Sequence, residues 1–382
     1  MVYLDNAASA PVRPEAVAAM MPMLTDCYAN PSGAHKMARE ARRHLDDARD
    51  VLAEAVGCAP GDVVFTAGGT EADNLAVFGV QAARGGSVAC AAVEHHAVLL
   101  PVEQLGGKII GVDHLGLVDL DNLALQIDAD TSLVSVGLVN GETGVIQDLV
   151  AIAEVVRTHA PSAVIHTDAV QAFPWLDVAT LAAPADLISI AGHKFGSPKG
   201  VGALIVREGV SVSAQQVGGG HERGIRSGTH NAPGIVAMAA AAAATVVNRD
   251  ETVGRVAALR DTLADGLLAT VPGTHETGVT SGGGAASRSG KIAGSCHVCF
   301  EGIESEALLF LLERDGIFAS AASSCSSGAQ DPSHVLAAMG YSRELAGGSL
   351  RLSLGHQSIE SDVAAALDAV ATSVQRLRET GS

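Results

Sequence analysis

Three short segments of the chain hold residues that could do chemistry, and the first is a glycine turn. A β-branched run from Val63 ends in Gly68-Gly69-Thr70 and leads into a helical pattern. Free backbone N–H groups at the start of such a helix, together with the Thr70 hydroxyl, would face an anion and could hold a phosphate. The sequence lacks the Gly-Lys-Ser/Thr of a Walker loop, and a plain tight turn would have the same pattern.

The other two segments put a carboxylate and an amine at the ends of apolar runs. Asp168 follows one predicted strand, and Lys194 follows the next. Ligands of open α/β sheets bind beyond the carboxyl ends of strands, so the two groups could face one crevice or simply form a structural ion pair. In the functional interpretation the lysine forms a Schiff base with an aldehyde cofactor, and the aspartate holds the protonated ring nitrogen of pyridoxal phosphate. The glycine turn would then bind the phosphate of the same molecule.

Cys325 is a candidate nucleophile. Small polar residues surround it (Ser-Ser-Cys-Ser-Ser-Gly), which favours an exposed thiol on a loop over a packed one. Alone, a loop cysteine is more often structural than catalytic. Cys296 and Cys299 have the spacing of a redox or zinc pair, but they fall in an apolar strand pattern without a second pair. His95 and His96 are expected on a strand, where neighbours point to opposite faces, so we expect no metal site.

The elements that would position these residues follow from the hydrophobic pattern. From residue 62 to residue 206, short β-branched runs alternate with helical patterns, which predicts an α/β fold with a mostly parallel sheet covered by helices. A charged helix is expected over 36–56, closed by Gly57. A second α/β unit is expected after a Gly/Ser-rich stretch at 278–294, which we interpret as a mobile loop. Its strands lie near 297–300 and 350–354, with a helix at 304–314.

Composition narrows the class of protein. The 382 residues are 48% hydrophobic and 17% charged, enough for a large domain and a smaller one with a sizeable core. A net charge of −18 and 3% aromatic residues argue against direct binding of nucleic acid. The apolar stretch 235–247 is too short to span a bilayer, and the first residues are unlike a signal peptide, so we expect no membrane association. Six cysteines without a dense disulfide framework favour the cytoplasm.

Motifs spread over nearly the whole chain point to one family. They are Tyr3–Ala8, Asn30–Ser32, Phe65–Ala76, Glu94–His96, Asn140–Gly144, His166–Gln171, Gly192–Lys194, Gly218–Thr229, Cys325–Leu336 and Leu350–Gly355. With these motifs the chain resembles the cysteine desulfurases of the class V aminotransferase family, in the group that serves iron–sulfur assembly and nitrogenase maturation. The resemblance implies the pyridoxal-phosphate-dependent aminotransferase fold type I. A large domain, residues 14–250, would bind the cofactor, and a smaller α/β domain, residues 1–13 and 251–382, would carry the Cys325 loop.

The resemblance also assigns roles around the cofactor ring. Lys194 would carry the Schiff base and later move protons, Asp168 would pair with the ring nitrogen, and Gln171 would bond the phenolic oxygen. His95 would stack on the ring and take part in acid–base steps, for which an imidazole that titrates near neutrality is suited.

At the phosphate, the resemblance implies contacts from Gly69, Thr70 and His193, and from Thr229 of the partner subunit. A homodimer is therefore expected. Arg351 would bind the substrate carboxylate through its bidentate fork, although an ordinary surface arginine on a strand would give the same sequence pattern.

The activity implied is a desulfuration. Cys325 would attack the sulfur of L-cysteine, L-alanine would leave, and a persulfide would remain on Cys325 for a sulfur-acceptor or scaffold protein. Two alternatives stay open. A lyase or aminotransferase acting on another amino acid, such as selenocysteine, would share most of this site, and a non-catalytic scaffold would keep the fold. An oxo acid product would indicate an aminotransferase.

Three positions depart from the family pattern. Gly141 stands where the family has a second asparagine, whose amide reaches the cofactor oxygen and the substrate carboxylate. Ala191 stands where many members have a serine that donates to the phosphate, a bond worth about 1.5 to 3 kcal/mol. Ala322 replaces a glycine hinge before the cysteine. We expect altered substrate affinity, weaker cofactor retention and different loop mobility.

Overall fold

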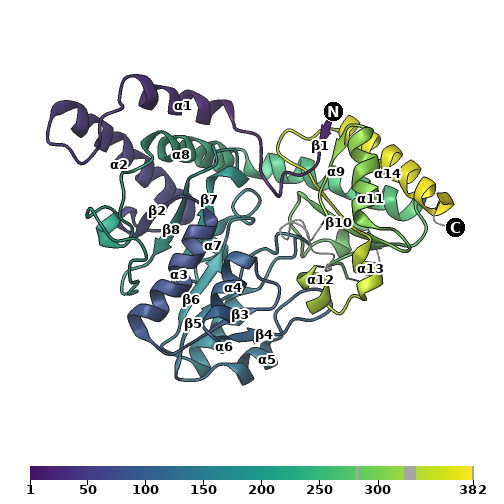
Figure 1. Ribbon diagram of the computed structural model, residues 1–382, viewed down its shortest axis with the longest axis horizontal. Helices are drawn as coiled ribbons and strands as arrows, with labels where there is room; N and C mark the ends of the chain where they lie inside the picture. The colour runs from purple at the N-terminus through teal and green to yellow at the C-terminus, as the bar shows by residue number, and fades with distance from the viewer. Residues whose placement is uncertain (281–283, 322–332, 381–382) are drawn as a thin grey trace.

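The computed structural model describes residues 1–280, 284–321 and 333–380. Cys325 and Ala322, both singled out above, lie outside the described residues. Figure 1 shows the central sheet and its helices on one side of the molecule, and the elements near the C-terminus, in green and yellow, on the other.

The central sheet is mostly parallel, as predicted. Among the described residues it has seven strands in the order β2-β8-β7-β6-β5-β3-β4, and only β8 runs against its neighbours. Every residue of β5, β7 and β8 is buried, which fits a sheet covered on both faces. The strands are β2 (Val63–Thr66), β3 (Ser87–Ala91), β4 (Lys108–Ile110), β5 (Thr131–Ser135), β6 (Val164–Asp168), β7 (Leu187–Ala191) and β8 (Gly202–Val206).

Helices surround this sheet. The predicted helix over 36–56 is α2, and Gly57 ends it with a φ of 67°, a left-handed conformation that glycine adopts without steric cost. The alanine-rich stretch forms α8, which packs against α1 and α2. The helices of this part are α1 (Pro14–Thr25), α2 (Lys36–Val56), α3 (Gly69–Arg84), α4 (His96–Gln104), α5 (Leu120–Gln126), α6 (Leu149–His159), α7 (Val178–Leu181) and α8 (Ala232–Val247), with 3-10 turns at Pro60–Asp62, Gly192–Lys194 and Glu222–Gly224.

A second group of elements contains two small sheets, one antiparallel and one parallel. The described residues form a three-stranded sheet in the order β12-β10-β9 and a two-stranded parallel sheet of β1 and β11. The strands are β1 (Val2–Tyr3), β9 (Thr274–Glu276), β10 (Ser295–Phe300), β11 (Ile317–Phe318) and β12 (Ser349–Ser353). The helices are α9 (Arg249–Thr270), α10 (Gly284–Ser287), α11 (Ser305–Arg314), α12 (His334–Ala338), α13 (Arg343–Gly347) and α14 (Glu360–Thr380). The division into residues 14–250 and residues 1–13 with 251–382 stays a prediction.

Among the described residues, no single helix is long and apolar enough to cross a membrane, and only α8 and α9 together, bent by 72°, meet the criteria of length and composition.

The N-terminal segment crosses the molecule. β1 pairs with β11 beside the C-terminal elements, with Val2 opposite Ile317, whereas α1 lies at the far end of the central sheet (Figure 1). On the way the chain passes the ends of the central strands, where Ala10 N donates a hydrogen bond to His193 O at 2.8 Å. This crossing brings N-terminal residues to the candidate site.

The Gly/Ser-rich stretch differs from the plain loop that its composition predicted. Its described residues, 278–280 and 284–294, include α10 and are tied to the rest of the protein at several points. Ile292 N donates to Gly144 O at 2.9 Å, and the buried Arg288 donates from Nε to Glu276 Oε2 at 2.8 Å. A buried arginine paired with a carboxylate anchors this stretch, which composition alone did not indicate.

Candidate active site

A cavity of about 660 Å³ lies where β6 and β7 end and where β12 approaches them. Most of the predicted site residues line it. They are Gly69, Thr70, His95, Asp168, Gln171, His193, Lys194 and Arg351. Because the carboxyl ends of parallel strands share one edge of a sheet, residues that are far apart in the sequence meet here.

The turn between β2 and α3 forms one end of the cavity. α3 begins at Gly69, so its first backbone N–H groups have no acceptor within the helix. A side chain at this position would bring its Cβ within 2.9 Å of Val170 Cγ2, so close packing requires the glycine. His193 lines the same cavity, and burial, with Lys194 and Lys199 nearby, lowers its pKa to about 4. Free amides and a neutral imidazole are groups that can hold a phosphate.

Asp168 lies at the end of β6, half-buried in the wall of the cavity. Its Oδ1 accepts a hydrogen bond from Val170 N at 2.8 Å. Burial raises the pKa of Asp168, and the Val170 amide, His95 and Lys194 oppose that shift. A carboxylate in this position gains most from a cationic N–H partner, which would return its pKa toward the ordinary range.

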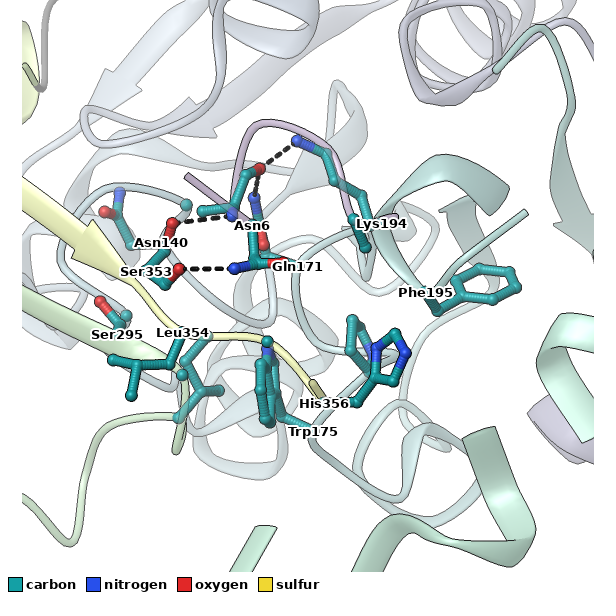
Figure 2. Close-up of a pocket in the computed structure, with 18 of the residues that line it drawn as sticks. Asn6, Asn140, Gln171, Trp175, Lys194, Phe195, Ser295, Ser353, Leu354 and His356 are labelled. Carbon is teal, nitrogen blue, oxygen red and sulfur yellow. Dashed lines mark hydrogen bonds between the residues drawn. The ribbon is translucent and has the colours of Figure 1, made fainter. Parts of the chain in front are cut away.

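Lys194 and Gln171 reach the same carbonyl oxygen of the crossing N-terminal segment. Both donate to Ala7 O, Gln171 from Nε2 at 2.6 Å, and Lys194 Nζ also donates to Ala8 O at 3.2 Å. In Figure 2, dashed lines from these two side chains meet at one oxygen, beside a smaller neighbouring cavity that both residues line together with Trp175. The amine and the amide are therefore within hydrogen-bonding reach of one point, as the prediction for a shared ligand requires.

His95 begins a helix rather than lying on a strand, so the strand prediction for this pair of histidines was wrong. β3 ends at Ala91, and His95 caps α4 by accepting a hydrogen bond at Nδ1 from Ala97 N at 3.1 Å. The ring is exposed in the cavity, but the surrounding protein lowers its pKa while Asp168 opposes the shift. No group of three or more His, Cys, Asp or Glu among the described residues could hold a metal ion.

Arg351 enters the cavity from β12. Its Nη2 lies 3.1 Å from Asp5 Oδ1, and its Nη1 donates to Gly141 O at 3.1 Å. The side chain is 14% exposed, so it is not an ordinary surface arginine. A guanidinium at the edge of a cavity, paired with Asp5, is suited to bind a carboxylate.

Two of the predicted residues do not join this set. Thr229 is exposed and is not among the residues lining the cavity of its own chain. Cys325 lies outside the described residues. The predicted roles of both stay predictions.

The sequence analysis missed several polar residues of the cavity wall. Glu94 is buried, accepts a hydrogen bond from Gly137 N at 2.8 Å, and has its pKa raised to about 8, chiefly by burial. His334 donates from Nε2 to Glu94 O at 2.9 Å and stacks on His96 with 4.6 Å between ring centroids. Glu142 lies in the Asn140–Gly144 motif. Glu94 and Glu142 stand inside motifs already singled out, but nothing in a motif tells that its carboxylate is buried.

Comparison with known proteins identifies the family. Residues 2–366 match the family model described as aminotransferase class-V. The chain is 39% identical over 385 residues to a cysteine desulfurase IscS from Methanosarcina thermophila, with 99% of this chain and 93% of the relative covered. It is 41% identical over 392 residues to an IscS-like cysteine desulfurase from Mycobacterium tuberculosis, with 99% and 97% covered.

A solved structure agrees with these sequence relatives. The chain superimposes on a NifS-like protein with a TM-score of 0.88 and 32% identity, and the match covers 98% of this chain and 99% of that one. This likeness confirms the predicted aminotransferase fold type I. The chain therefore belongs to the class-V aminotransferase family and, within it, to the cysteine desulfurases.

Proposed function

We propose that this protein is a homodimeric, pyridoxal-phosphate-dependent enzyme that converts L-cysteine to L-alanine and leaves a persulfide on Cys325. The observation that carries the proposal is the single cavity that receives Asp168 from β6, Lys194 from the turn after β7, and the glycine turn before α3. The two relatives described above, both named cysteine desulfurases, support the choice of substrate.

The residues of the cavity fit pyridoxal phosphate. Asp168 would pair with the ring nitrogen, Gln171 would donate to the phenolic oxygen, and Thr70 and His193 would hold the phosphate with the amides of the glycine turn. His193 Nδ1 is buried and has no hydrogen-bond partner among the described residues. This is expected for a group whose hydrogen-bond partner is a ligand. When bound, the cofactor supplies an electron sink for the bonds of the substrate's α-carbon.

The chain's own groups would orient the substrate and move protons. Arg351 would bind the substrate carboxylate in exchange for Asp5, which it contacts at 3.1 Å. Lys194 Nζ would hold the cofactor and then carry protons to and from the substrate. His95, whose pKa is lowered, would be a neutral imidazole able to accept a proton at neutral pH.

Sulfur transfer would follow from attack by the Cys325 thiolate on the substrate sulfur. The new S–S bond forms as the C–S bond breaks, and the electron pair of the broken bond stays on the carbon. That carbon takes up a proton, which gives L-alanine, and the persulfide on Cys325 is available to a sulfur-acceptor or scaffold protein. A thiolate is required because the thiol is a poor nucleophile.

One experiment tests whether Lys194 holds the cofactor and Cys325 carries out the sulfur transfer. Lys194→Ala should abolish both the covalently held cofactor, detected by borohydride reduction and peptide mapping, and alanine release from L-cysteine. Cys325→Ala should keep the cofactor on Lys194 and lose alanine release, whereas the control Cys27→Ala should keep both. Cofactor fixed on Lys199 or on no lysine would overturn the proposal, and so would undiminished alanine release by Cys325→Ala.

The same assay separates the alternatives. An oxo acid instead of alanine would indicate an aminotransferase, and activity with L-selenocysteine but not with L-cysteine would indicate a selenocysteine lyase. Absence of cofactor and product in the unmodified protein would indicate a scaffold.

The homodimer rests on a second cavity. About 680 Å³ opens on the outer side of the glycine turn, lined by Thr70, His193, Lys199 and Arg226 among others. Thr229 of the partner subunit would enter this cavity beside the phosphate. Because each site would then need residues of both chains, mixing inactive Lys194→Ala with inactive Thr229→Asp should restore activity through one intact site per mixed dimer. No recovery in a proven mixed dimer would contradict the shared site.

A further inference from the structure

Buried polar atoms without partners gather behind Arg351. Within the described residues, Glu142 Oε1, His297 Nε2 and Arg351 Nε are buried and have no hydrogen-bond partner. His297 and Arg351 are opposite each other in the β10–β12 pairing, so their side chains project from the same face of the sheet. Glu142 Oε1 lies 3.8 Å from His297 Nε2. Buried groups in a native protein usually have partners, so this cluster calls for a physical account.

A rigid turn fixes the position of Glu142. Asn140 Oδ1 accepts hydrogen bonds from Glu142 N at 3.0 Å and from Thr143 N at 2.8 Å, and Asn140 Nδ2 donates to Val93 O at 2.9 Å. Gly144 closes the turn with a φ of 82°. The carboxylate is therefore held against β10 and β12 by the backbone of the turn.

Ser333 decides which oxygen of Glu142 can carry a proton. Ser333 Oγ accepts from Val335 N at 3.1 Å and from Leu336 N at 3.2 Å, so its one hydrogen is free to donate to Glu142 Oε2, 2.7 Å away. A proton on the Glu142 carboxyl must therefore be on Oε1, the oxygen that faces His297.

His297 is placed to share that proton. Its Nδ1 lies 2.8 Å from Thr277 Oγ1, which leaves Nε2 opposite Glu142 Oε1. The 3.8 Å between the two atoms is too long for a direct hydrogen bond. His297 Nε2 and Glu142 Oε1 thus face each other as two neighbouring atoms that can each carry a proton.

The charges around this pair determine its protonation. Arg351 of β12 lies near both groups and is itself paired with Asp5, while Lys291 lies near His297 and the neutral thiol of Cys299 lies near Glu142. Burial raises the pKa of Glu142 to about 7, against Ser333 and Arg351, and burial holds the pKa of His297 well below its ordinary value. Near neutral pH the pair is therefore either neutral or carries one negative charge.

We propose that Glu142 and His297 are positioning residues for the substrate carboxylate, and that Glu142 takes up one proton at Oε1 when a carboxylate binds to Arg351. Without substrate, Arg351 faces the carboxylates of Asp5 and, when it is ionised, Glu142. A further carboxylate would be repelled by the ionised Glu142, so binding favours its protonation, and release of the carboxylate returns the proton to solvent. This inference rests on the proposed function, because it concerns the carboxylate of the amino acid substrate.

Proton uptake on binding is the direct test. The holoenzyme is titrated with L-alanine, the product, by calorimetry at about pH 7 in two buffers of different ionisation enthalpy, for the unmodified protein and for Glu142→Gln. The unmodified protein should take up a larger fraction of a proton than the variant. Ethylamine, which is L-alanine without its carboxylate, should give the same proton count for both proteins. Equal uptake of protons with L-alanine by both proteins would overturn the inference.

Kinetics give a second readout. In the unmodified enzyme the KM for L-cysteine should rise by about fivefold as the pH passes upward through the pKa of Glu142, the size of a typical coupling between sites. In Glu142→Gln that rise should be lost, and the change should fall on KM more than on kcat. A variant that keeps the same rise would refute the role of Glu142.

A second variant covers the case in which Glu142→Gln fails to fold. Ser333→Ala removes the donor to Oε2 and so should move the midpoint of the KM rise to higher pH, because hydrogen bonds to a carboxylate favour its ionised form. An unmoved midpoint would count against the proposal. Failure of the proposed function would look different, since the unmodified protein would then release no alanine from L-cysteine.

Discussion

Two glutamates of this protein are similarly buried, and their pKa values are shifted in opposite directions. Glu222, in the Gly218–Thr229 motif, is 8% exposed, and Glu142, in the Asn140–Gly144 turn, is 7% exposed. Burial alone would raise the pKa of both carboxyls. In Glu222, hydrogen bonds from His230 and Arg49 and from the Phe65 amide overcome burial and lower the pKa to about 2. In Glu142 the pKa rises to about 7.

The difference lies in the donors that each carboxylate meets. Glu222 Oε1 accepts from Arg49 Nη2 at 2.7 Å and from His230 Nε2 at 2.6 Å, and Oε2 accepts from Phe65 N at 2.8 Å. Glu142 accepts from Ser333 at one oxygen, and the other has no partner among the described residues. A carboxylate surrounded by donors serves as a fixed anchor, whereas one with an open oxygen can exchange a proton.

The anchor holds a strained backbone. Glu222 and Arg223 have φ values of 45° and 57°, in the left-handed region that residues with a Cβ enter at a cost. The bonds from the Glu222 carboxylate to β2 and α2 keep this segment against the central sheet. The segment ends at Thr229, the residue proposed to reach the partner subunit.

The largest effect is expected when the Glu222 carboxylate is removed. Glu222→Ala leaves Arg49, His230 and the Phe65 amide without their acceptor, and loss of one partner of a buried ion pair costs about 3–5 kcal/mol. The free energy of unfolding in urea should fall by that amount. Asp128→Ala, which removes an exposed partner of Lys108, is the matched control and should change it little. A small effect at Glu222 would show that the strained segment is held by other contacts.

The second test compares how the two carboxyls respond to pH. The folded pKa of Glu222, about 2, lies below the ordinary 4.5, so its contribution to stability is present above 4.5 and is lost as the pH falls through 2. The folded pKa of Glu142, about 7, lies above 4.5, so its contribution is present below 4.5 and is lost as the pH rises through 7. Each shift corresponds to about 3 kcal/mol.

The measurement is the free energy of unfolding against pH for the unmodified protein, Glu222→Gln and Glu142→Gln. The difference curve for Glu222→Gln should change below pH 4.5, and that for Glu142→Gln between pH 4.5 and 7. If both differences in the free energy of unfolding changed with pH in the same direction, the pKa values of Glu222 and Glu142 would not be shifted in opposite directions.

The third and smallest effect concerns Gly141, the neighbour of Glu142. A Cβ built on Gly141 lies 3.3 Å from Gln171 Cγ, a flexible side chain that can give way. Gly141→Asn should therefore fold and add one contact to the substrate carboxylate. A net hydrogen bond of about 0.5–1.5 kcal/mol corresponds to about a two- to tenfold change, and it should appear in the KM for L-cysteine more than in kcat, because the contact exists before and during the reaction.

The matched control for that variant is Gly254→Asn on the exposed side of α9, where an added Cβ meets no atom within 4 Å. A change of kcat with an unaltered KM in Gly141→Asn would show that this turn is not beside the substrate carboxylate.

The cofactor side of the cavity could be predicted from the sequence, whereas the side around Glu142 could not. Asp168 and Lys194 follow apolar runs, and the rule that ligands bind at strand ends predicts that the two residues meet. The bond between Glu142 and Ser333 joins residues 191 positions apart, and the pairing of His297 with Arg351 depends on the register of two strands. A contact between residues far apart in the sequence, or a pairing set by strand register, leaves no pattern in the neighbouring residues of the sequence.

The histidines of the Glu94–His96 motif illustrate the same limit at shorter range. The apolar run before them predicted a strand, and the strand exists, but β3 ends at Ala91 and the chain turns before His95 caps α4. Element boundaries depend on which residue first finds a capping partner, and that partner, the Ala97 amide, becomes available only in the folded helix.

The parallel pairing of β1 with β11 has a consequence for how the protein is made. Val2 is synthesised 315 residues before its partner Ile317. Until then the N-terminal strand has no place to dock, and the Ala7 and Ala8 carbonyls that meet Lys194 are not held in the cavity. Such a long-range closure is slow, because the entropy of the intervening chain must be overcome first. The cavity is therefore completed late, after the central sheet has had the opportunity to form.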